Sequence, residues 1–486
     1  MNPAHVALAL ISHTNNGKTT LARTLVGIDV GEVRDAAHVT TMAEAHPLLR
    51  TPEGDSLELW DTPGFGDSVR LLRRLALAGN PIGWFLREVI DRYRDRPFWL
   101  SQQALRTARD AADVVLYLVN SSEHPRDAGY LPAEMKILEW LGKPVLVLLN
   151  QLGPPRPAQE ERDEQQRWQR HLEQFPIVRG VLALDAFARC WVHERVFYDA
   201  VGAVLDPAKQ PGYARLFAVW ERYNIERFHA AMDLIGAQLA AAACDAEPIP
   251  EAEEGGVLQS AMKVIGLGKG TQKRRQEQAM AQLLERVNAS IGATTAGLLK
   301  LHQLDPGETG RIHARVREHF AVRAPVDKTQ ASLLGAIVSG AATGLSADLM
   351  AGGLTFGGGA LIGGIVGALT MAGAAWGFNT TTRRDRPSVQ FADDFLHSLL
   401  VSNVLRYLAV AHFGRGRGNF VESEAPPFWQ EELEDALGRH PTGAVWQEVR
   451  EGDGAGLPLA RLAGAITRDV LDHLYPGSLP LSRLDM

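Results

Sequence analysis

Five short apolar runs before residue 206 constrain the fold more than any other feature of this sequence. They are HVALALIS (5–12), LELWD (57–61), DVVLYLVN (113–120), PVLVLLN (144–150) and GVLALD (180–185). Most of them are almost continuously apolar, which is typical of strands that are buried on both faces of a parallel sheet. Helical segments separate the runs, so the sequence predicts right-handed βαβ units in an α/β domain with a mostly parallel sheet.

The first run leads into a stretch close to the phosphate-binding loop pattern, ISHTNNGKTT (11–20). The usual pattern is Gly, four residues and then Gly-Lys-Ser/Thr. Gly17, Lys18 and Thr19 match its second half, whereas Ser12 stands in place of the first glycine. Serine is small and lies at the entrance of the loop, so we expect the loop to function.

The chemistry expected of this loop follows from its place between a strand and a helix. Backbone N–H groups at a helix start can surround a phosphate, aided by the helix dipole. Lys18 is expected to reach the β- and γ-phosphates, and the Thr19 hydroxyl to bind Mg²⁺. The expected nucleotide-binding residues of the loop are Asn15, Asn16, Gly17, Lys18, Thr19 and Thr20.

A second motif, Asp-Thr-Pro-Gly, follows the apolar run at 57–61 and ends at Gly64. In phosphate-loop enzymes an aspartate at the end of such a strand holds Mg²⁺, and the glycine N–H meets the γ-phosphate. Asp61 is therefore expected to share a metal ion with Thr19, and Gly64 to contact the reacting phosphate.

NNGKTT (15–20), DTPGFGD (61–67) and PVLVLLN together resemble the small GTPase domain of the Era, Obg and tRNA-modification GTPase (TRAFAC) class over roughly residues 5–205. The layout of the remaining chain is similar to bacterial GTPases with a helical C-terminal region and a Gly/Ala-rich apolar segment. The resemblance implies a P-loop NTPase (Ras-like) fold and a molecular switch. It also implies Mg²⁺-dependent hydrolysis of GTP, coupled to movement of two switch segments near 34–44 and 64–80.

The resemblance also gives roles to residues around these motifs. HVTT (38–41) matches the switch I threonines, so Thr40 or Thr41 would complete the Mg²⁺ shell in the triphosphate state. Asn15 stands where potassium-activated members of the class carry an asparagine that coordinates K⁺. The alternative for these residues is that they are ordinary polar loop positions.

The base-reading motif departs from the class pattern Asn-Lys-x-Asp. Here the strand ends in Asn150 and continues to Gly153, so the asparagine is kept and the aspartate that pairs with the base is absent. Losing such a partner removes much of the discrimination between bases. Asp185 follows the last strand and is a candidate for the missing carboxylate, with a simple strand-end cap as the alternative. The preference for GTP is therefore implied by the resemblance and not by these residues. The alternative is an NTPase of relaxed base specificity that also binds ATP.

A second departure concerns catalysis. Phe65 follows the second motif, where Ras-like enzymes place the glutamine that orients water. An apolar side chain cannot orient water, so hydrolysis would depend on switch residues, K⁺ or a partner's group. We therefore predict slow intrinsic turnover, and the alternative is a pseudo-GTPase scaffold.

Beyond residue 205 the strand signal largely disappears, and the spacing of apolar residues predicts an all-α C-terminal region. An acidic linker with proline and glycine interrupts this region at 245–256. The predicted domains are a GTPase domain at 1–205, a helical domain at 206–330, a Gly/Ala-rich apolar helical hairpin at 331–378 and a helical region at 379–486.

The predicted hairpin is the second unusual region. Residues 331–378 contain one ionisable residue, Asp348, which is least costly at the turn of the hairpin. Gly359, Gly363 and Gly367 follow at four-residue spacing, which lets helices pack closely in a membrane. We expect insertion into, or association with, the inner membrane from the cytoplasmic side. A buried pair of Ala/Gly helices and a partner-binding surface are the alternatives.

Composition limits the remaining functions. The net charge of -7 argues against a general nucleic-acid binder. Cys190 and Cys244 match no metal or redox spacing, and the N-terminal apolar run has no basic leader, so we expect a cytoplasmic protein. The expected partners are GTP and GDP, a membrane lipid or integral membrane protein, and a second copy bound through the GTPase domain. No nucleic-acid partner is expected.

Overall fold

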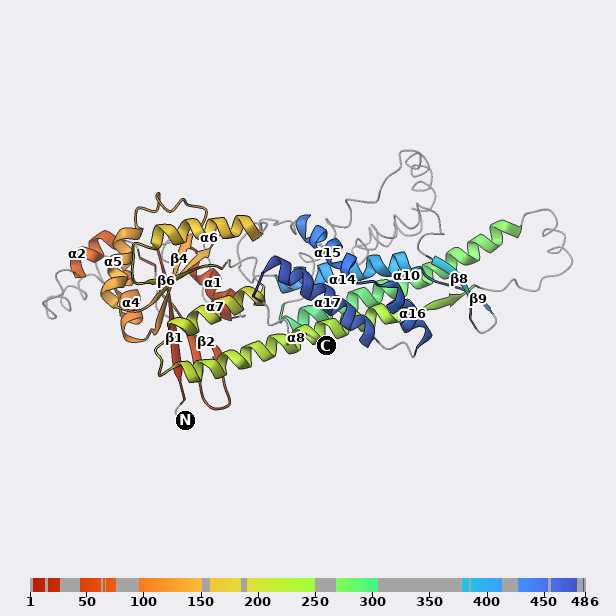
Figure 1. Cartoon of the computed structure of the whole chain (residues 1–486), viewed down its shortest axis with the longest axis horizontal. Helices are drawn as coiled ribbons and strands as arrows, with labels where there is room; N and C mark the ends of the chain where they lie inside the picture. Colours follow the sequence, from red (N-terminus) through yellow and green to blue (C-terminus); the bar gives the residue numbers. More distant parts are fainter. Residues whose placement is uncertain are drawn as a thin grey trace. The chain divides into compact units, whose positions relative to one another are not determined.

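The computed structural model of the chain divides into two compact units (Figure 1). Unit 1 comprises 1–226, 411–426 and 474–479, and unit 2 comprises 227–410, 427–473 and 480–486. The structure describes residues 3–13, 16–26, 44–62, 64–65, 67–75, 96–150, 158–184, 190–249, 268–304, 378–383, 386–412, 427–452, 456–478 and 484.

Unit 1 contains a six-stranded sheet with the order β2-β3-β1-β4-β5-β6. The strands are β1 (His5–Ser12), β2 (Glu44–Arg50), β3 (Ser56–Asp61), β4 (Val114–Asn120), β5 (Val145–Asn150) and β6 (Val178–Ala183). All neighbouring pairs are parallel except β2 with β3. The five predicted strands and the mostly parallel α/β fold are confirmed, and no strand end is shifted by more than two residues.

β2 was not predicted from the sequence. Its residues EAHPLLR form no continuous apolar run, and none of its described side chains is fully buried. The strand lies at the edge of the sheet and its register with β3 shifts between Pro47 and Leu49. Proline lacks a backbone N–H and is tolerated in sheets at edges and bulges. The strand therefore forms because β3 offers it an antiparallel partner.

Six described helices of unit 1 surround this sheet (Figure 1). They are α1 (Lys18–Val26), α2 (Ser68–Leu75), α4 (Arg96–Asp110), α5 (Leu131–Leu141), α6 (Ala158–Leu172) and α7 (Trp191–Val204). Every residue of β5 is buried, as are all residues of β4 except its last. The central strands therefore hold the core, and their carboxyl ends form the sheet edge at which parallel α/β domains bind ligands.

The long helix α8 (Gln210–Cys244) begins in unit 1, where two ion pairs fix its start to the opposite edge of the sheet. Lys209 Nζ lies 2.7 Å from both carboxylate oxygens of Asp113, which immediately precedes β4. Arg215 donates from Nε and Nη2 to the two oxygens of the buried Asp55, both at 2.7 Å. These contacts anchor the first turns of α8.

Unit 2 is mainly helical, which confirms the predicted helical C-terminal region. It contains the rest of α8 and most or all of α10 (Gly268–Leu301), α14 (Asp393–Ala411), α15 (Pro427–Arg439), α16 (Gly443–Glu451) and α17 (Leu457–Leu474). A small sheet of order β7-β9-β8 was not predicted. Its strands are β7 (Ala246–Pro248), β8 (Phe378–Arg383) and β9 (Arg386–Phe391). β7 comes from the acidic linker, whose first residues pair with β9.

The predicted apolar hairpin lies outside the described residues, apart from its last residue, Phe378, which begins β8. Among the helices that the structure describes, none combines the length and the hydropathy needed to cross a membrane.

Gly236 marks a close crossing of α8 and α17 within unit 2. A Cβ atom there would lie 2.5 Å from the backbone nitrogen of Ala460 and 2.6 Å from the carbonyl oxygen of Gly456. Gly236→Ala is expected to force the helices apart and lower the free energy of unfolding by about 1–3 kcal/mol. Urea denaturation measures this. Gly292→Ala in α10, where a Cβ meets nothing within 4 Å, is the control and is expected to be neutral or stabilising. Equal losses in both variants would contradict the steric explanation.

Candidate nucleotide-binding site

The phosphate loop connects the end of β1 to the start of α1, as predicted. Gly17 has φ of +81°, a left-handed conformation that favours glycine. Its carbonyl oxygen accepts a hydrogen bond from the Leu21 N–H at 3.0 Å, which closes the first turn of α1. Thr20 lies buried within that turn. Asn15, the predicted potassium ligand, lies outside the described residues.

Lys18 is buried, with 8% of its surface exposed, and its Nζ donates a hydrogen bond to Ser12 Oγ at 2.9 Å. The hydroxyl of Ser12 in turn donates to the carbonyl oxygen of His13. The residue that replaces the first glycine of the pattern thus holds the lysine. Burial lowers the pKa of Lys18, and the charges of Asp61 and Glu134 partly offset that effect. A buried ammonium group whose charge is disfavoured gains from an anion placed beside it.

Thr19, in the first turn of α1, comes together with Asp61, the last residue of β3. β1 and β3 are parallel, so the residues at their carboxyl ends share one edge of the sheet. The Thr19 hydroxyl donates to Asp61 Oδ2 at 2.8 Å. A hydroxyl and a carboxylate are oxygen ligands of the kind that Mg²⁺ takes, together with phosphates and water, so this pair fits the ion. Within the described part of the chain, no group of three His, Cys, Asp or Glu side chains could hold a metal.

Gly64 ends the second motif and Phe65 follows it, and both are buried. The Phe65 N–H donates to the carbonyl oxygen of Ser12 at 2.9 Å, so this segment lies against the start of the phosphate loop. The ring of Phe65 belongs to the apolar core of unit 1 and is fully buried. It packs in the core and offers no group that could orient a water molecule. Thr40 and Thr41 lie outside the described residues.

Asn150 is buried at the end of β5 and holds the phosphate loop. Its Nδ2 donates to the carbonyl oxygen of Asn16 at 2.9 Å. Asn16 Nδ2 donates in turn to the carbonyl oxygen of Leu118 in β4, at 3.2 Å. These bonds connect the loop to the two central strands. Residues 151–157 and Asp185, which include the other candidate base-reading positions, lie outside the described residues.

A buried acid beside the loop was not predicted. Glu134 of α5 is fully buried, and one of its carboxylate oxygens lies 2.7 Å from His13 Nδ1. The other accepts a hydrogen bond from the hydroxyl of Tyr117 in β4. The ring of Tyr130 stacks on His13 with centroids 4.3 Å apart. The available signal was a glutamate among the apolar residues of LPAEMKILEWL, because a buried carboxylate needs partners.

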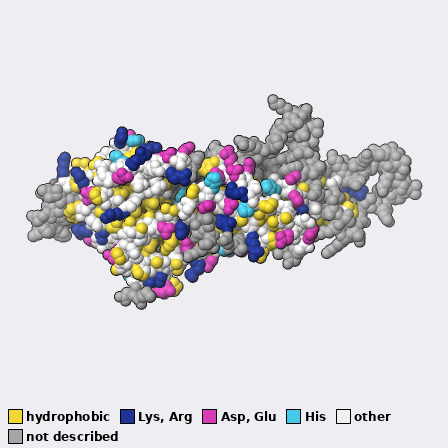
Figure 2. All heavy atoms as spheres, viewed as in Figure 1, with side chains coloured by type: hydrophobic (Ala, Val, Ile, Leu, Met, Phe, Trp, Pro, Cys, Tyr) yellow, Lys and Arg dark blue, Asp and Glu magenta, His cyan; other side chains and the backbone are white. Residues whose placement is uncertain are grey.

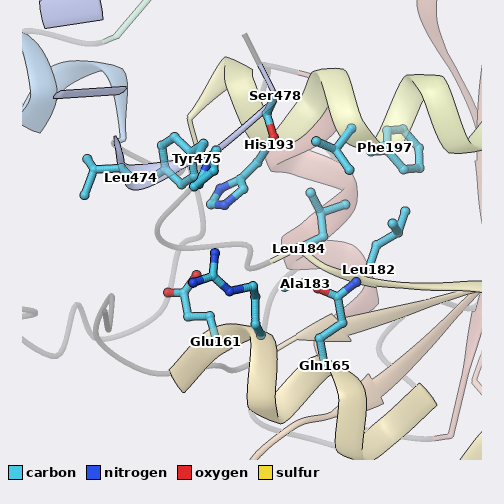
Figure 3. Close-up of a pocket in the computed structure, with 13 residues that line it drawn as sticks. Glu161, Gln165, Leu182, Ala183, Leu184, His193, Phe197, Leu474, Tyr475 and Ser478 are labelled. Atoms are coloured by element: carbon cyan, nitrogen blue, oxygen red, sulfur yellow. The ribbon is translucent and has the colours of Figure 1, made fainter. Parts of the chain in front are cut away.

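A cavity of about 220 Å³ opens in unit 1 near the carboxyl end of β6 (Figure 3). Glu161 and Gln165 of α6 line one side, and His193 of α7 lines the other with Tyr475. Tyr475 packs edge-on against His193, with centroids 4.2 Å apart, and its hydroxyl lies 2.6 Å from His412 Nε2. Burial raises the pKa of Tyr475. The segment that follows α17 therefore closes this side of unit 1.

Comparison with known proteins agrees with this geometry. The family described as "50S ribosome-binding GTPase" matches residues 7–151, which hold the phosphate loop and the Thr19–Asp61 pair. The family described as a domain of unknown function, DUF3482, matches residues 170–451, more than half of the chain. The chain belongs to the DUF3482 family. The N-terminal part of this DUF3482 protein is a P-loop GTPase domain.

Several solved structures match part of the DUF3482 protein. Era of Aquifex aeolicus bound to GDP and AlF₄⁻ is 19% identical with a TM-score of 0.31, and the match covers 42% of this chain and 57% of that chain. Era in complex with MgGDPNP and nucleotides of 16S ribosomal RNA is 18% identical, with a TM-score of 0.31 and coverage of 42% and 58%. A structure of chloroplast translocon GTPase components is 13% identical, with a TM-score of 0.25 and coverage of 39% and 72%.

The DUF3482 protein thus spans less than two thirds of the length of the Era chains that it matches. No curated protein matches the chain.

Proposed function

We propose that this DUF3482 protein is a molecular switch that binds GTP and hydrolyses its β–γ phosphate bond with Mg²⁺. The observation that carries the proposal is the arrangement at one sheet edge of the buried Lys18 ammonium group and the Thr19–Asp61 pair. A buried cation beside a helix start fits a phosphate chain, and the neighbouring hydroxyl and carboxylate fit its magnesium ion.

In this proposal each residue has a distinct task. The N–H groups around Gly17 and the Lys18 ammonium bind the β- and γ-phosphates, and Gly64 contributes an N–H to the γ-phosphate. Thr19 binds the metal directly and Asp61 holds it through water, with Thr40 or Thr41 added in the triphosphate state. When bound, Mg²⁺ neutralises charge that develops on the phosphates.

Slow turnover is part of the proposal. The Phe65 ring lies in the core, so the orientation of the attacking water depends on switch residues, on K⁺ held by Asn15 or on a group from a partner. An arginine supplied by a partner is worth ~10³–10⁵ in rate in related enzymes. We therefore expect hydrolysis to be faster in KCl than in NaCl and to rise further with the partner.

The base preference is tested by binding GTP, ATP and XTP side by side. Asn150 holds the loop through the Asn16 carbonyl oxygen. We propose that it lies at the base end of the site and that Asp185 supplies the missing carboxylate. Tighter binding of GTP than of ATP, lost in Asp185→Asn, is the expected result. Equal affinities for GTP and ATP would instead favour the NTPase of relaxed specificity, and binding without turnover would favour the scaffold.

Thr19→Ala is expected to remove the stabilisation of GTP by Mg²⁺. The variant loses the hydroxyl ligand, so its GTP affinity in Mg²⁺ should fall by about 10–100-fold, in line with the loss of one charge-assisted contact. Titration of a fluorescent GTP analogue with Mg²⁺ and with EDTA measures this. Thr24→Ala, whose hydroxyl bonds the Thr20 carbonyl one turn further along α1, is the control and should keep its response to Mg²⁺. An unchanged response in Thr19→Ala would remove Thr19 from the metal site.

Association with the inner membrane from the cytoplasmic side completes the proposal. It is supported by the absence of charged residues from 349 to 378 and by the row of glycines at Gly359, Gly363 and Gly367. Alkaline carbonate extraction tests it, because an inserted hairpin stays in the membrane pellet. Complete release would exclude insertion. A homodimer through the GTPase domain is the other proposed assembly.

A further inference from the structure

Unit 1 carries a second concentration of positive charge, in a pocket away from the phosphate loop. The pocket has a volume of about 400 Å³, within the usual range of ~300–1,000 Å³ for small-ligand sites. Its charged lining consists of three arginines and two histidines, with no carboxylate: His124, Arg126, Arg167, Arg170 and His171. Figure 2 shows Lys, Arg and His side chains gathered over the part of unit 1 where α6 lies. A chain with a net charge of -7 does not produce such a cluster through its overall composition.

Among the arginines of this cationic pocket, one forms an ion pair with a carboxylate in the described part of the chain. Arg167 pairs with Glu164 at 3.1 Å. Arg170 uses its Nε to bond the Gln166 carbonyl oxygen at 3.2 Å. Within the described part of the chain, neither Arg126 nor Arg170 has a carboxylate oxygen within 4.0 Å of its guanidinium. Two guanidinium groups thus lack an acidic partner there.

The histidines add donors to the same pocket. His124 Nδ1 accepts the backbone N–H of Arg126 at 3.2 Å, so the neutral ring carries its proton on Nε2 and can donate it. Burial lowers the pKa of His171, and the positive charges of Arg126 and His124 lower it further. The like charges in the pocket therefore repel one another, and a bound anion relieves that repulsion.

We propose that the cationic pocket is a second phosphate-binding site of the protein, one that takes a phosphate monoester or pyrophosphate group. The guanidinium fork matches phosphate oxygens in paired hydrogen bonds. A compact di- or polyanion can contact several of the five cationic or donor side chains at once. An extended chain of phosphodiesters carries only one negative charge per nucleotide and would contact fewer of them. The group can come from a soluble phosphate ester or from a lipid headgroup, and the two sources share this chemistry.

The site is tied to the phosphate loop through the segment 121–130. Its residues His124 and Arg126 line the cationic pocket, and its last residue, Tyr130, stacks on His13 beside the loop. Glu123 accepts a hydrogen bond from the Tyr130 hydroxyl at 3.3 Å. One short segment of chain therefore contacts both sites.

The test uses the full chain with Lys18→Ala, which disables the nucleotide site and leaves the cationic pocket intact. The probes are inorganic pyrophosphate, followed by calorimetry, and phosphatidylcholine vesicles with phosphatidic acid, followed by flotation. We expect binding of at least one probe, weakened at least about 10-fold by Arg126→Ala with Arg170→Ala. Which probe binds identifies the source of the phosphate group.

The matched control is Arg109→Ala with Arg179→Ala, which changes the net charge of unit 1 by the same amount outside the pocket. It should change the affinity less than about 2-fold, because solvent and salt screen exposed charges outside the pocket. No binding of either probe, or equal losses in both double variants, would overturn the proposal. Tighter binding of a single-stranded RNA oligonucleotide that is lost in the pocket variant would also overturn it, in favour of a phosphodiester ligand. GTP binding by the chain without these substitutions tests the proposed switch independently.

Discussion

Lys18→Ala is expected to weaken the binding of GTP by at least about 100-fold. The wild-type ammonium group is buried against Ser12 Oγ, where it is already partly desolvated and positioned. A hydrogen bond to a charged group contributes ~1.5–3 kcal/mol, and each 1.4 kcal/mol corresponds to a factor of ten. Contacts to both the β- and the γ-phosphate would therefore account for a loss of this size. Hydrolysis should fall further, since charge on the γ-phosphate increases in the transition state.

Titration with a fluorescent GTP analogue measures the affinity, and circular dichroism checks that the variant is folded. Lys136→Ala is the matched control, because Lys136 is an exposed lysine on α5 of the same unit. Its affinity for GTP should stay within about 2-fold of wild type. An unchanged affinity in Lys18→Ala would show that the phosphate-loop assignment is wrong, and with it the proposed function.

Asp55→Asn is expected to cause a clear loss of stability. The carboxylate of Asp55 is completely buried and accepts two hydrogen bonds from Arg215. It also accepts the Ala4 N–H at 2.8 Å and the Thr51 hydroxyl at 2.9 Å. The amide keeps the shape but loses the charge and one acceptor, which costs at least about 2 kcal/mol. Arg215 is partly exposed, so solvent screens its charge. The expected loss in the free energy of unfolding is therefore near this lower value.

The loss of stability in Asp55→Asn is expected to depend on pH. Hydrogen bonds from Arg215 hold the pKa of Asp55 well below its ordinary value, and burial opposes this only in part. A carboxyl with a lowered pKa in the folded state stabilises the fold above its unfolded value of about 3.9. That stabilisation is lost as the pH falls from about 4 towards the folded pKa. The difference between wild type and variant should therefore be constant near neutral pH and shrink in acid.

Urea denaturation at several pH values measures this difference. Asp110→Asn is the control, since its carboxylate is exposed and pairs with the exposed Arg109. Exposed pairs contribute ~0–1 kcal/mol, so this variant should be nearly as stable as wild type. If both variants lost the same amount at neutral pH, the Asp55–Arg215 pair would not be what anchors the start of α8.

The sequence predicted the parts of this protein in which the evidence is local. β1, the phosphate loop and α1 are contiguous, and a buried strand followed by Gly17, Lys18 and Thr19 leaves few other structures for that stretch. The apolar runs likewise predicted the parallel sheet, because each run is a continuous stretch of the chain. β2 was not predicted, because its sequence contains polar residues and a proline and it forms a strand by pairing with β3. The small sheet of unit 2 was not predicted because β7 has only three residues and its partner strand, β9, lies far along the chain at Arg386–Phe391.

The sequence by itself thus determined the class of the domain and the chemistry of its phosphate end. Only the tertiary structure placed Ser12 under Lys18, joined Glu134 to His13 and gathered the cationic pocket from two separate segments. The physical reason is that periodicity and motifs act between neighbours in the chain. Contacts between residues such as His13 and Glu134 depend instead on strand order, on register and on how each helix packs over the sheet.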